Sequence, residues 1–177
     1  YIIQLLNNNN NMNNNMNNSA ENSSLGGPVV ESTTEESDFH LDINKEYSDF
    51  DIMGLSENLL RGIFSYGFEK PSRVQQLGIV KVSSGKDIIC QSQSGTGKTA
   101  TFSIGSIQRI NLDNKNTQIL ILAPTRELAK QIKDVVTNLS SYMGVTTHLC
   151  IGGESLDINI KALDKGAQVV VGTPGRV

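Results

Sequence analysis

The sequence predicts an α/β domain in which a mostly parallel sheet lies between helices, preceded by a tail that forms no core. Two observations lead to this prediction. Short apolar runs such as "QILILA" and "QVVVG" show no polar alternation, which is typical of strands buried on both faces of a parallel sheet. Segments with apolar residues at helical spacing separate these runs, and such alternation is typical of a three-layer α/β domain.

Residues 1–45 are predicted to be a disordered, Asn-rich and acidic tail, and residues 46–177 to be the folded domain. Residues 7–18 are asparagine apart from Met12 and Met16, and residues 23–38 are polar and acidic. Such segments bury too little apolar surface to offset the entropy lost on ordering. Beyond Phe50 there are ten acidic residues against fourteen Lys and Arg, a balance that permits a polyanionic partner.

Composition excludes several other classes of protein. No apolar run approaches the roughly 18 residues of a membrane span, and the opening "YIIQLL" is too short for the core of a signal peptide. Cys90 and Cys150 lack the close spacing of a metal site, so we expect buried free thiols in a reducing compartment. His40 and His148 are isolated, which argues against a zinc site. These observations predict a soluble intracellular protein without a membrane partner.

Two helices are expected after residue 50. The first follows Ser56 as N-cap residue, contains apolar residues at helical spacing, and ends before Gly67. The second follows Ser72 and ends before Gly85. Strands and helices then alternate: strands at 87–91, 117–124, 147–153 and 167–174, and helices over about 97–110, 126–142 and 155–163.

A phosphate-binding loop is predicted at "SGTGKT", because this segment follows an expected strand and opens a helix. Gly95 and Gly97 permit backbone conformations that direct successive N–H groups at phosphate oxygens. Lys98 would contact the β- and γ-phosphates, and the Thr99 hydroxyl would coordinate Mg²⁺. The general pattern G-x-x-x-x-G-K-[ST] expects a glycine where this chain has Ser92. The alternative is an ordinary Gly/Ser-rich turn before a helix.

Three further strand ends carry polar or glycine-rich sequences, and in a parallel sheet all such ends meet at one edge. Hydroxyl groups, free backbone N–H groups and arginines there suit contacts with a sugar–phosphate backbone, which position a strand without reading its bases. Each of these turns alone could be an ordinary strand-to-helix connection. The candidate residues for these sugar–phosphate contacts are Pro124, Thr125, Arg126, Gly152, Gly153, Thr173, Pro174, Gly175 and Arg176.

The segments "GFEKPSRVQ", "QSGTGKT", "PTRELA", "GG" and "TPGR" occur in this order, and they resemble the DEAD-box RNA helicases. In that family the loop reads A-x-x-G-x-G-K-T, so Ser92 replaces the usual alanine. The wider sequence is similar to the translation initiation factor four-A group, and Ser92 and Ser103 are similar to its third, exon-junction member. The resemblance implies a RecA-like P-loop domain and an ATP-dependent RNA helicase located in the nucleus or cytoplasm, with a lean to the nucleus.

The resemblance also implies roles for individual residues. Lys98 and Thr99 are the expected catalytic residues, and Thr99 the expected Mg²⁺ ligand. Gln75 would pair with the adenine edge, because a carboxamide donates and accepts at once. The Phe50 ring would stack on adenine, or else pack against the first helix. The expected ATP-binding residues are Phe50, Phe68, Pro71, Gln75, Ser94, Gly95, Thr96, Gly97, Lys98, Thr99 and Ala100.

The family's Asp-Glu-Ala-Asp box is expected about twenty residues after "TPGR", beyond Val177. By this resemblance the chain is an N-terminal fragment that lacks residues needed for hydrolysis and the second RecA-like domain. Expected partners are single-stranded RNA, bound without sequence preference, and other translation or mRNA-processing proteins. An ATP-gated RNA clamp or scaffold with little unwinding is the alternative function, because it uses the same motifs.

Overall fold

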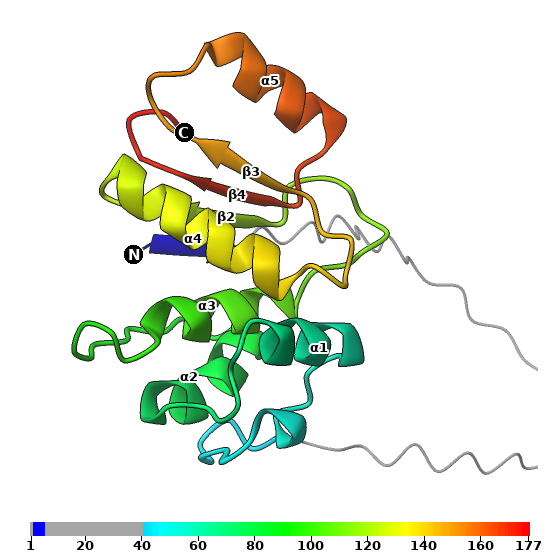
Figure 1. Cartoon of the computed structure of the whole chain (residues 1–177), viewed down its shortest axis with the longest axis vertical. Helices are drawn as coiled ribbons and strands as arrows, with labels where there is room; N and C mark the ends of the chain where they lie inside the picture. Colours follow the sequence, from blue (N-terminus) through cyan, green and yellow to red (C-terminus); the bar gives the residue numbers. More distant parts are fainter. Residues whose placement is uncertain (1, 6–40) are drawn as a thin grey trace, which may run out of the picture. The chain divides into compact units, whose positions relative to one another are not determined.

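The computed structural model describes residues 2–5 and 41–177 (Figure 1). Most of the predicted tail, including its Asn-rich tract, therefore lies outside the described residues. Residues Ile2–Leu5 differ from the prediction, because they form strand β1 and pair antiparallel with β2 (Ile119–Leu122). Without β1, strand β2 would be an edge strand with unpaired N–H and C=O groups. The extended segment Ile2–Leu5 supplies partners for these groups.

The sheet has the order β1-β2-β4-β3. Strands β2, β3 (Thr147–Cys150) and β4 (Val169–Gly172) run parallel, as the uninterrupted apolar runs predict. All four residues of β4 are buried, as its uninterrupted apolar run predicts. The prediction of a mostly parallel α/β sheet is confirmed for these three strands.

The helices follow the strands in the predicted order. Helix α4 (Arg126–Leu139) follows β2 and contacts β3 and β4, with Ala129, Ile132, Val136 and Leu139 buried (Figure 1). Helix α5 (Leu156–Lys165) follows β3 and contacts it. Thr125 begins α4 as its N-cap residue and accepts a hydrogen bond from the Leu128 N–H at 3.2 Å.

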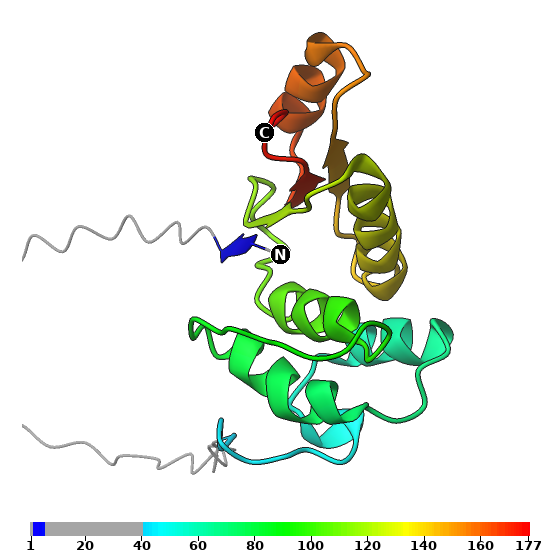
Figure 2. The ribbon, with the colours of Figure 1, turned by 90° about the vertical axis from the view of Figure 1, so that its left-hand side faces the viewer.

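The other helices are α1 (Glu57–Ser65), α2 (Arg73–Ser83) and α3 (Lys98–Ile107), preceded by the short 3₁₀ helix η1 (Phe50–Ile52). Helices α2 and α3 pack together, and Figure 2 shows them as neighbours. The predicted N-cap residues of α1 and α2, Ser56 and Ser72, stand immediately before these helices. Residues 100–107 of α3 are all buried, so α3 is the central helix of this group.

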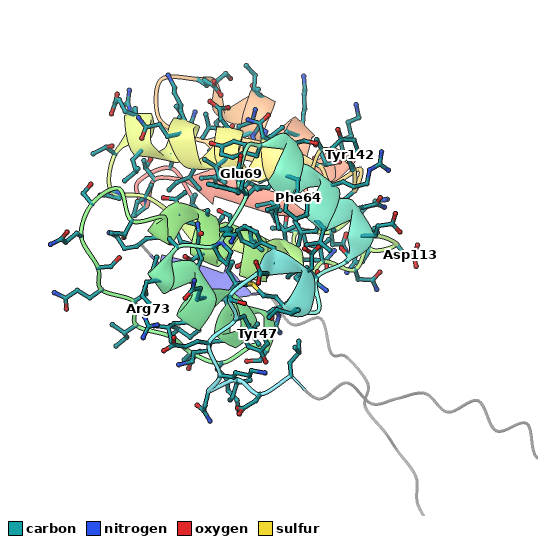
Figure 3. The ribbon with its side chains drawn as sticks, turned by 60° about the horizontal axis from the view of Figure 1, so that its bottom comes forward. Tyr47, Phe64, Glu69, Arg73, Asp113 and Tyr142 are labelled. Atoms are coloured by element: carbon teal, nitrogen blue, oxygen red, sulfur yellow. The ribbon has the colours of Figure 1, made fainter. Side chains whose placement is uncertain are left out.

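The segment before α2 is attached to that helix. Tyr47, labelled with Arg73 in Figure 3, donates its N–H to the Gln76 carbonyl at 3.2 Å. Arg73, the first residue of α2, forms an ion pair with Glu46. Both contacts attach the segment before η1 to the first half of α2.

The predicted strand at residues 87–91 is wrong: this segment has no regular structure, and all five residues are exposed. The Ile89 side chain is fully exposed, and Cys90 is exposed rather than buried. A strand requires a neighbouring strand that supplies backbone hydrogen bonds. In this sheet β1 pairs with the edge of β2, so residues 87–91 cannot pair there. Apolar composition predicted the strand but could not supply its partner.

Both cysteines are free thiols, as predicted, and Cys150 is buried at the end of β3. Within residues 2–5 and 41–177, none of the helices has the length and apolar character that crossing a membrane requires.

Candidate functional site

The predicted phosphate loop forms a tight turn at the start of α3. Gly97 is the N-cap residue of α3 and has a φ of +96°, and Gly95 has a φ of +80°. Only glycine adopts these left-handed conformations without strain. The turn leaves the first N–H groups of α3 free to point toward an anion, at the end where the helix dipole favours negative charge.

Within the loop, the side chains bond to the loop's own backbone. The Lys98 ammonium donates to the Ser92 carbonyl at 2.7 Å and also to the Gln93 carbonyl. The Thr96 hydroxyl donates to the Gln93 carbonyl at 2.8 Å and lies 2.6 Å from the Ser92 hydroxyl. Thr99 follows as the second residue of α3 and is half-buried. The predicted loop residues therefore come together, and Ser92 is an additional member of the group.

A cavity of about 1020 Å³ lies beside the loop, between α2, α3 and residues 85–92. Its lining includes five cationic side chains and one carboxylate, that of Asp87. This excess of positive charge, next to the N-terminus of α3, favours an anionic ligand. The cationic residues are Arg73, Lys81, Lys86, Lys98 and Arg109.

The first turn of α2 is bonded directly to the loop. The Ser72 hydroxyl donates to the Thr96 carbonyl at 2.8 Å, and the Ser72 N–H donates to Gln75 Oε1 at 2.8 Å. Gln75 is only 2% exposed. A Cβ atom added at Gly97 would lie 2.6 Å from Gln75 Nε2, so the carboxamide is packed against the loop backbone. In this structure Gln75 positions the loop, and its contact with adenine stays a prediction.

The Phe50 ring packs inside the protein in this structure, and its stacking on adenine stays a prediction. Phe50 is 1% exposed and belongs to the apolar core. Its ring packs edge-on against Phe64 at 6.3 Å and lies 6.4 Å from the Phe68 ring. This packing against Phe64 of α1 favours the alternative, in which the ring contributes to the core.

Phe68 and Pro71, two other predicted ATP-binding residues, differ in exposure. Phe68 is half-buried, and its ring lies 5.0 Å from that of Tyr66, which is 40% exposed. Pro71 is buried just before the capping box of α2. Tyr66 was not among the predicted residues. The sequence signal for it was an aromatic residue two positions before Phe68.

The three predicted RNA-contact segments meet at one edge of the sheet. The last paired residues of β2, β4 and β3 are Leu122, Gly172 and Cys150, which lie in one row across the sheet. The chain leaves each strand just beyond this row, so the candidate residues that follow are neighbours in space. Pro124, Thr125, Gly153, Pro174 and Gly175 are exposed there, with Thr173 half-buried.

Two arginines organise this edge. The Arg126 guanidinium lies over the Gly152–Gly153 backbone, since a Cβ atom at Gly152 would be 2.8 Å from it. The Arg176 guanidinium donates to the Glu154 carbonyl. Glu154 was not among the predicted residues, and only its place after "GG" could have indicated it. Both guanidinium groups thus lie at the segment 152–154, where arginines suit a phosphodiester backbone.

Cys150 lies beneath this edge. Burial raises the pKa of the Cys150 thiol, and the nearby Arg176 charge acts in the opposite direction. Among the residues that the structure describes, no group of three or more His, Cys, Asp or Glu side chains is placed to hold a metal ion.

Residues 72–177 match the model of the DEAD/DEAH box helicase family. The chain is 54% identical to eukaryotic initiation factor 4A-9 of Nicotiana tabacum over 81% of its own length and 35% of that protein. It is 55% identical to the ATP-dependent RNA helicase fal1 of Schizosaccharomyces pombe over 84% of its length and 36% of that protein. The chain thus spans about a third of the length of these relatives.

Solved structures of related proteins have a similar fold. A DEAD box protein from Methanococcus jannaschii superposes with a TM-score of 0.69 at 40% identity, covering 74% of this chain and 36% of the other. Saccharomyces cerevisiae Dbp5 bound to RNA and ADP BeF3 superposes with a TM-score of 0.63 at 37% identity, covering 73% of this chain and 33% of Dbp5.

Proposed function

Because the chain belongs to the DEAD/DEAH box helicase family, we propose that it provides the nucleotide-binding loop and one RNA-contacting edge of an ATP-dependent RNA helicase of the initiation factor four-A group. The observation that carries the proposal is the loop itself. Lys98, two left-handed glycines and the N-terminus of α3 converge beside a cavity with a cationic lining. Relatives named initiation factor 4A and ATP-dependent RNA helicase support the choice of reaction.

ATP is the proposed nucleotide. Lys98 would exchange the carbonyls of Ser92 and Gln93 for the β- and γ-phosphate oxygens, since all of these are acceptors for its ammonium group. Thr99 would offer its hydroxyl to Mg²⁺, which binds proteins through few side chains and through substrate phosphates. Mg²⁺ would neutralise phosphate charge during phosphoryl transfer. Ser94, Gly95, Thr96, Gly97 and Ala100 would supply the loop and its backbone donors.

The adenine ring is proposed to lie near Phe68 and Pro71. Phe68 and the adjacent Tyr66 keep ring surface accessible, whereas Phe50 does not. Gln75 Nε2 would donate to the adenine edge while Gln75 Oε1 remains bonded to the Ser72 N–H. This assignment keeps the capping box of α2 intact on nucleotide binding.

Single-stranded RNA is proposed to cross the edge formed by the ends of β2, β3 and β4. The contacts available there are arginine side chains, hydroxyls and backbone N–H groups, which bind phosphates and sugars without reading bases. Other translation or mRNA-processing proteins are proposed as partners, in line with the relatives' names. Those names give no support to the expected lean toward the nucleus.

The test is nucleotide binding by this chain, measured with a fluorescent ATP analogue and Mg²⁺. We expect Lys98→Ala to weaken binding at least tenfold, because charge-assisted hydrogen bonds to phosphate contribute about 1.5–3 kcal/mol each. Lys115→Ala is the matched control, because Lys115 is an exposed lysine outside the lining of the cavity. Equal affinity of the Lys98→Ala variant and the unmodified chain would contradict the proposal.

A further inference from the structure

We propose that the Ser92 hydroxyl is a positioning group that stabilises a self-bonded conformation of the phosphate loop, and that this conformation competes with nucleotide for the loop. The inference rests on the proposed nucleotide site and adds a residue that sets its affinity. It concerns a side chain that the family pattern, with alanine at this place, does not use.

The self-bonded conformation is closed by two sets of contacts. The Lys98 ammonium binds the carbonyls of Ser92 and Gln93, which turns its charge toward the loop's own backbone. The Ser92 and Thr96 hydroxyls lie 2.6 Å apart, and the Thr96 hydroxyl also donates to the Gln93 carbonyl at 2.8 Å. Residues 92 and 93 therefore contact both Thr96 and Lys98. Each set of contacts holds residues 92 and 93 in the position that the other set requires.

A phosphate ligand needs the Lys98 ammonium, so binding requires this lysine to leave the two carbonyls. Whatever holds residues 92 and 93 against Thr96 keeps these carbonyls within reach of Lys98. The Ser92 hydroxyl does so through a side-chain contact that alanine cannot make, whereas the Ser92 carbonyl is present with any residue. The contribution of the hydroxyl can therefore be removed by itself.

The expected effect follows from the population of the competent loop. When only a fraction of molecules can bind, the apparent Kd is the intrinsic Kd divided by that fraction. One neutral hydrogen bond shifts such an equilibrium by roughly two- to tenfold. Ser92→Ala should therefore lower the Kd for Mg²⁺–ATP by about that factor.

The experiment is a double-mutant cycle on the full chain with Ser92→Ala, Thr96→Val and the double variant, measuring the Kd for Mg²⁺–ATP. We expect Ser92→Ala to bind more tightly, and to have little further effect in the Thr96→Val background, because the partner hydroxyl is already absent. Thr137→Val is the matched control: Thr137 forms a hydroxyl pair with Thr147 at 2.8 Å, away from the loop. A Kd that rises or stays constant in Ser92→Ala would overturn the proposal.

Chemical labelling of the nucleotide-free chain separates this proposal from the proposed function. In the self-bonded loop the Lys98 ammonium is bonded to two carbonyls. Ser92→Ala should therefore speed acetylation of Lys98 several-fold, while the melting temperature and acetylation of the exposed Lys115 stay constant. A chain that binds no nucleotide would contradict the proposed function, and the rate of Lys98 acetylation would still decide about the self-bonded loop. An unchanged rate at Lys98 would overturn it.

Discussion

Replacing Gly97 by alanine should damage the site more than the same change at Gly95, although both glycines have a positive φ. At Gly97 the new Cβ atom would lie 2.6 Å from Gln75 Nε2 and 3.2 Å from the Ser72 hydroxyl oxygen. At Gly95 no described atom lies within 4 Å of the added Cβ. The pair therefore separates backbone strain from the steric clash with α2.

The magnitudes follow from these contacts. A non-glycine residue in the left-handed region costs about 1–2 kcal/mol, which both variants incur. Gly97→Ala must also displace the buried Gln75 side chain, and overpacking of this kind adds about 1–3 kcal/mol. We expect Gly95→Ala to lower the free energy of unfolding by about 1–2 kcal/mol and Gly97→Ala by about 2–5 kcal/mol.

The assay is urea unfolding of the two variants and of Gly67→Ala, with the Kd for Mg²⁺–ATP measured in parallel. Gly67 has a φ of +98° and an open surrounding, so its variant reports strain alone, far from the loop in sequence. Gly97→Ala should also weaken nucleotide binding, because Gln75 and Ser72 hold the loop backbone. Equal loss of stability in Gly95→Ala and Gly97→Ala would refute the packing of Gln75 against the loop.

Four other predictions test the remaining parts of the structure. Arg126→Ala should weaken binding of single-stranded RNA for every base sequence alike and reduce the slope of log K against log salt by about 1, measured by fluorescence anisotropy at several salt concentrations. At pH 7–8 iodoacetamide should label the buried Cys150 thiol, whose pKa is raised, far more slowly than the exposed Cys90 thiol; equal rates would contradict its burial. Because the folded-state pKa of Cys150 is raised, its contribution to stability should be lost as the pH rises through that value. Ile158 is one of four exposed apolar residues of α5, and such residues promote association. Ile158→Glu should therefore raise the highest protein concentration at which light scattering still detects only monomers.

Much of the fold could be predicted because its signals are local. Apolar residues at positions 129, 132, 136 and 139 define one buried face of α4, and the uniform apolar run of β4 predicts a strand buried on both sides. The N-cap residues Ser56 and Ser72 predict where α1 and α2 begin. The loop and the strand-end residues could be predicted for the same reason: each depends on residues close together in the sequence.

The errors come from contacts between distant parts of the chain. Residues 87–91 have the composition of a strand, but strand formation depends on a partner that composition does not reveal. Residues Ile2–Leu5 find such a partner in β2, against the prediction of a disordered tail. An aromatic ring at position 50 suits a core or a ligand equally, and the sequence does not show that Phe64 and Phe68 pack around it.

The two halves of the proposed site depend on different packing. The phosphate loop is positioned by α2, through the bond from the Ser72 hydroxyl to the Thr96 carbonyl and through Gln75 against Gly97. The edge proposed to contact RNA is positioned by the register of β2, β4 and β3, which sets the row where all three strands end. Substitutions in the first turn of α2 should therefore change nucleotide affinity with little effect on RNA affinity, and substitutions that disturb strand register should do the reverse. Helix α3 joins the two halves, because it begins at the loop and packs against α4, whose first residue is Arg126.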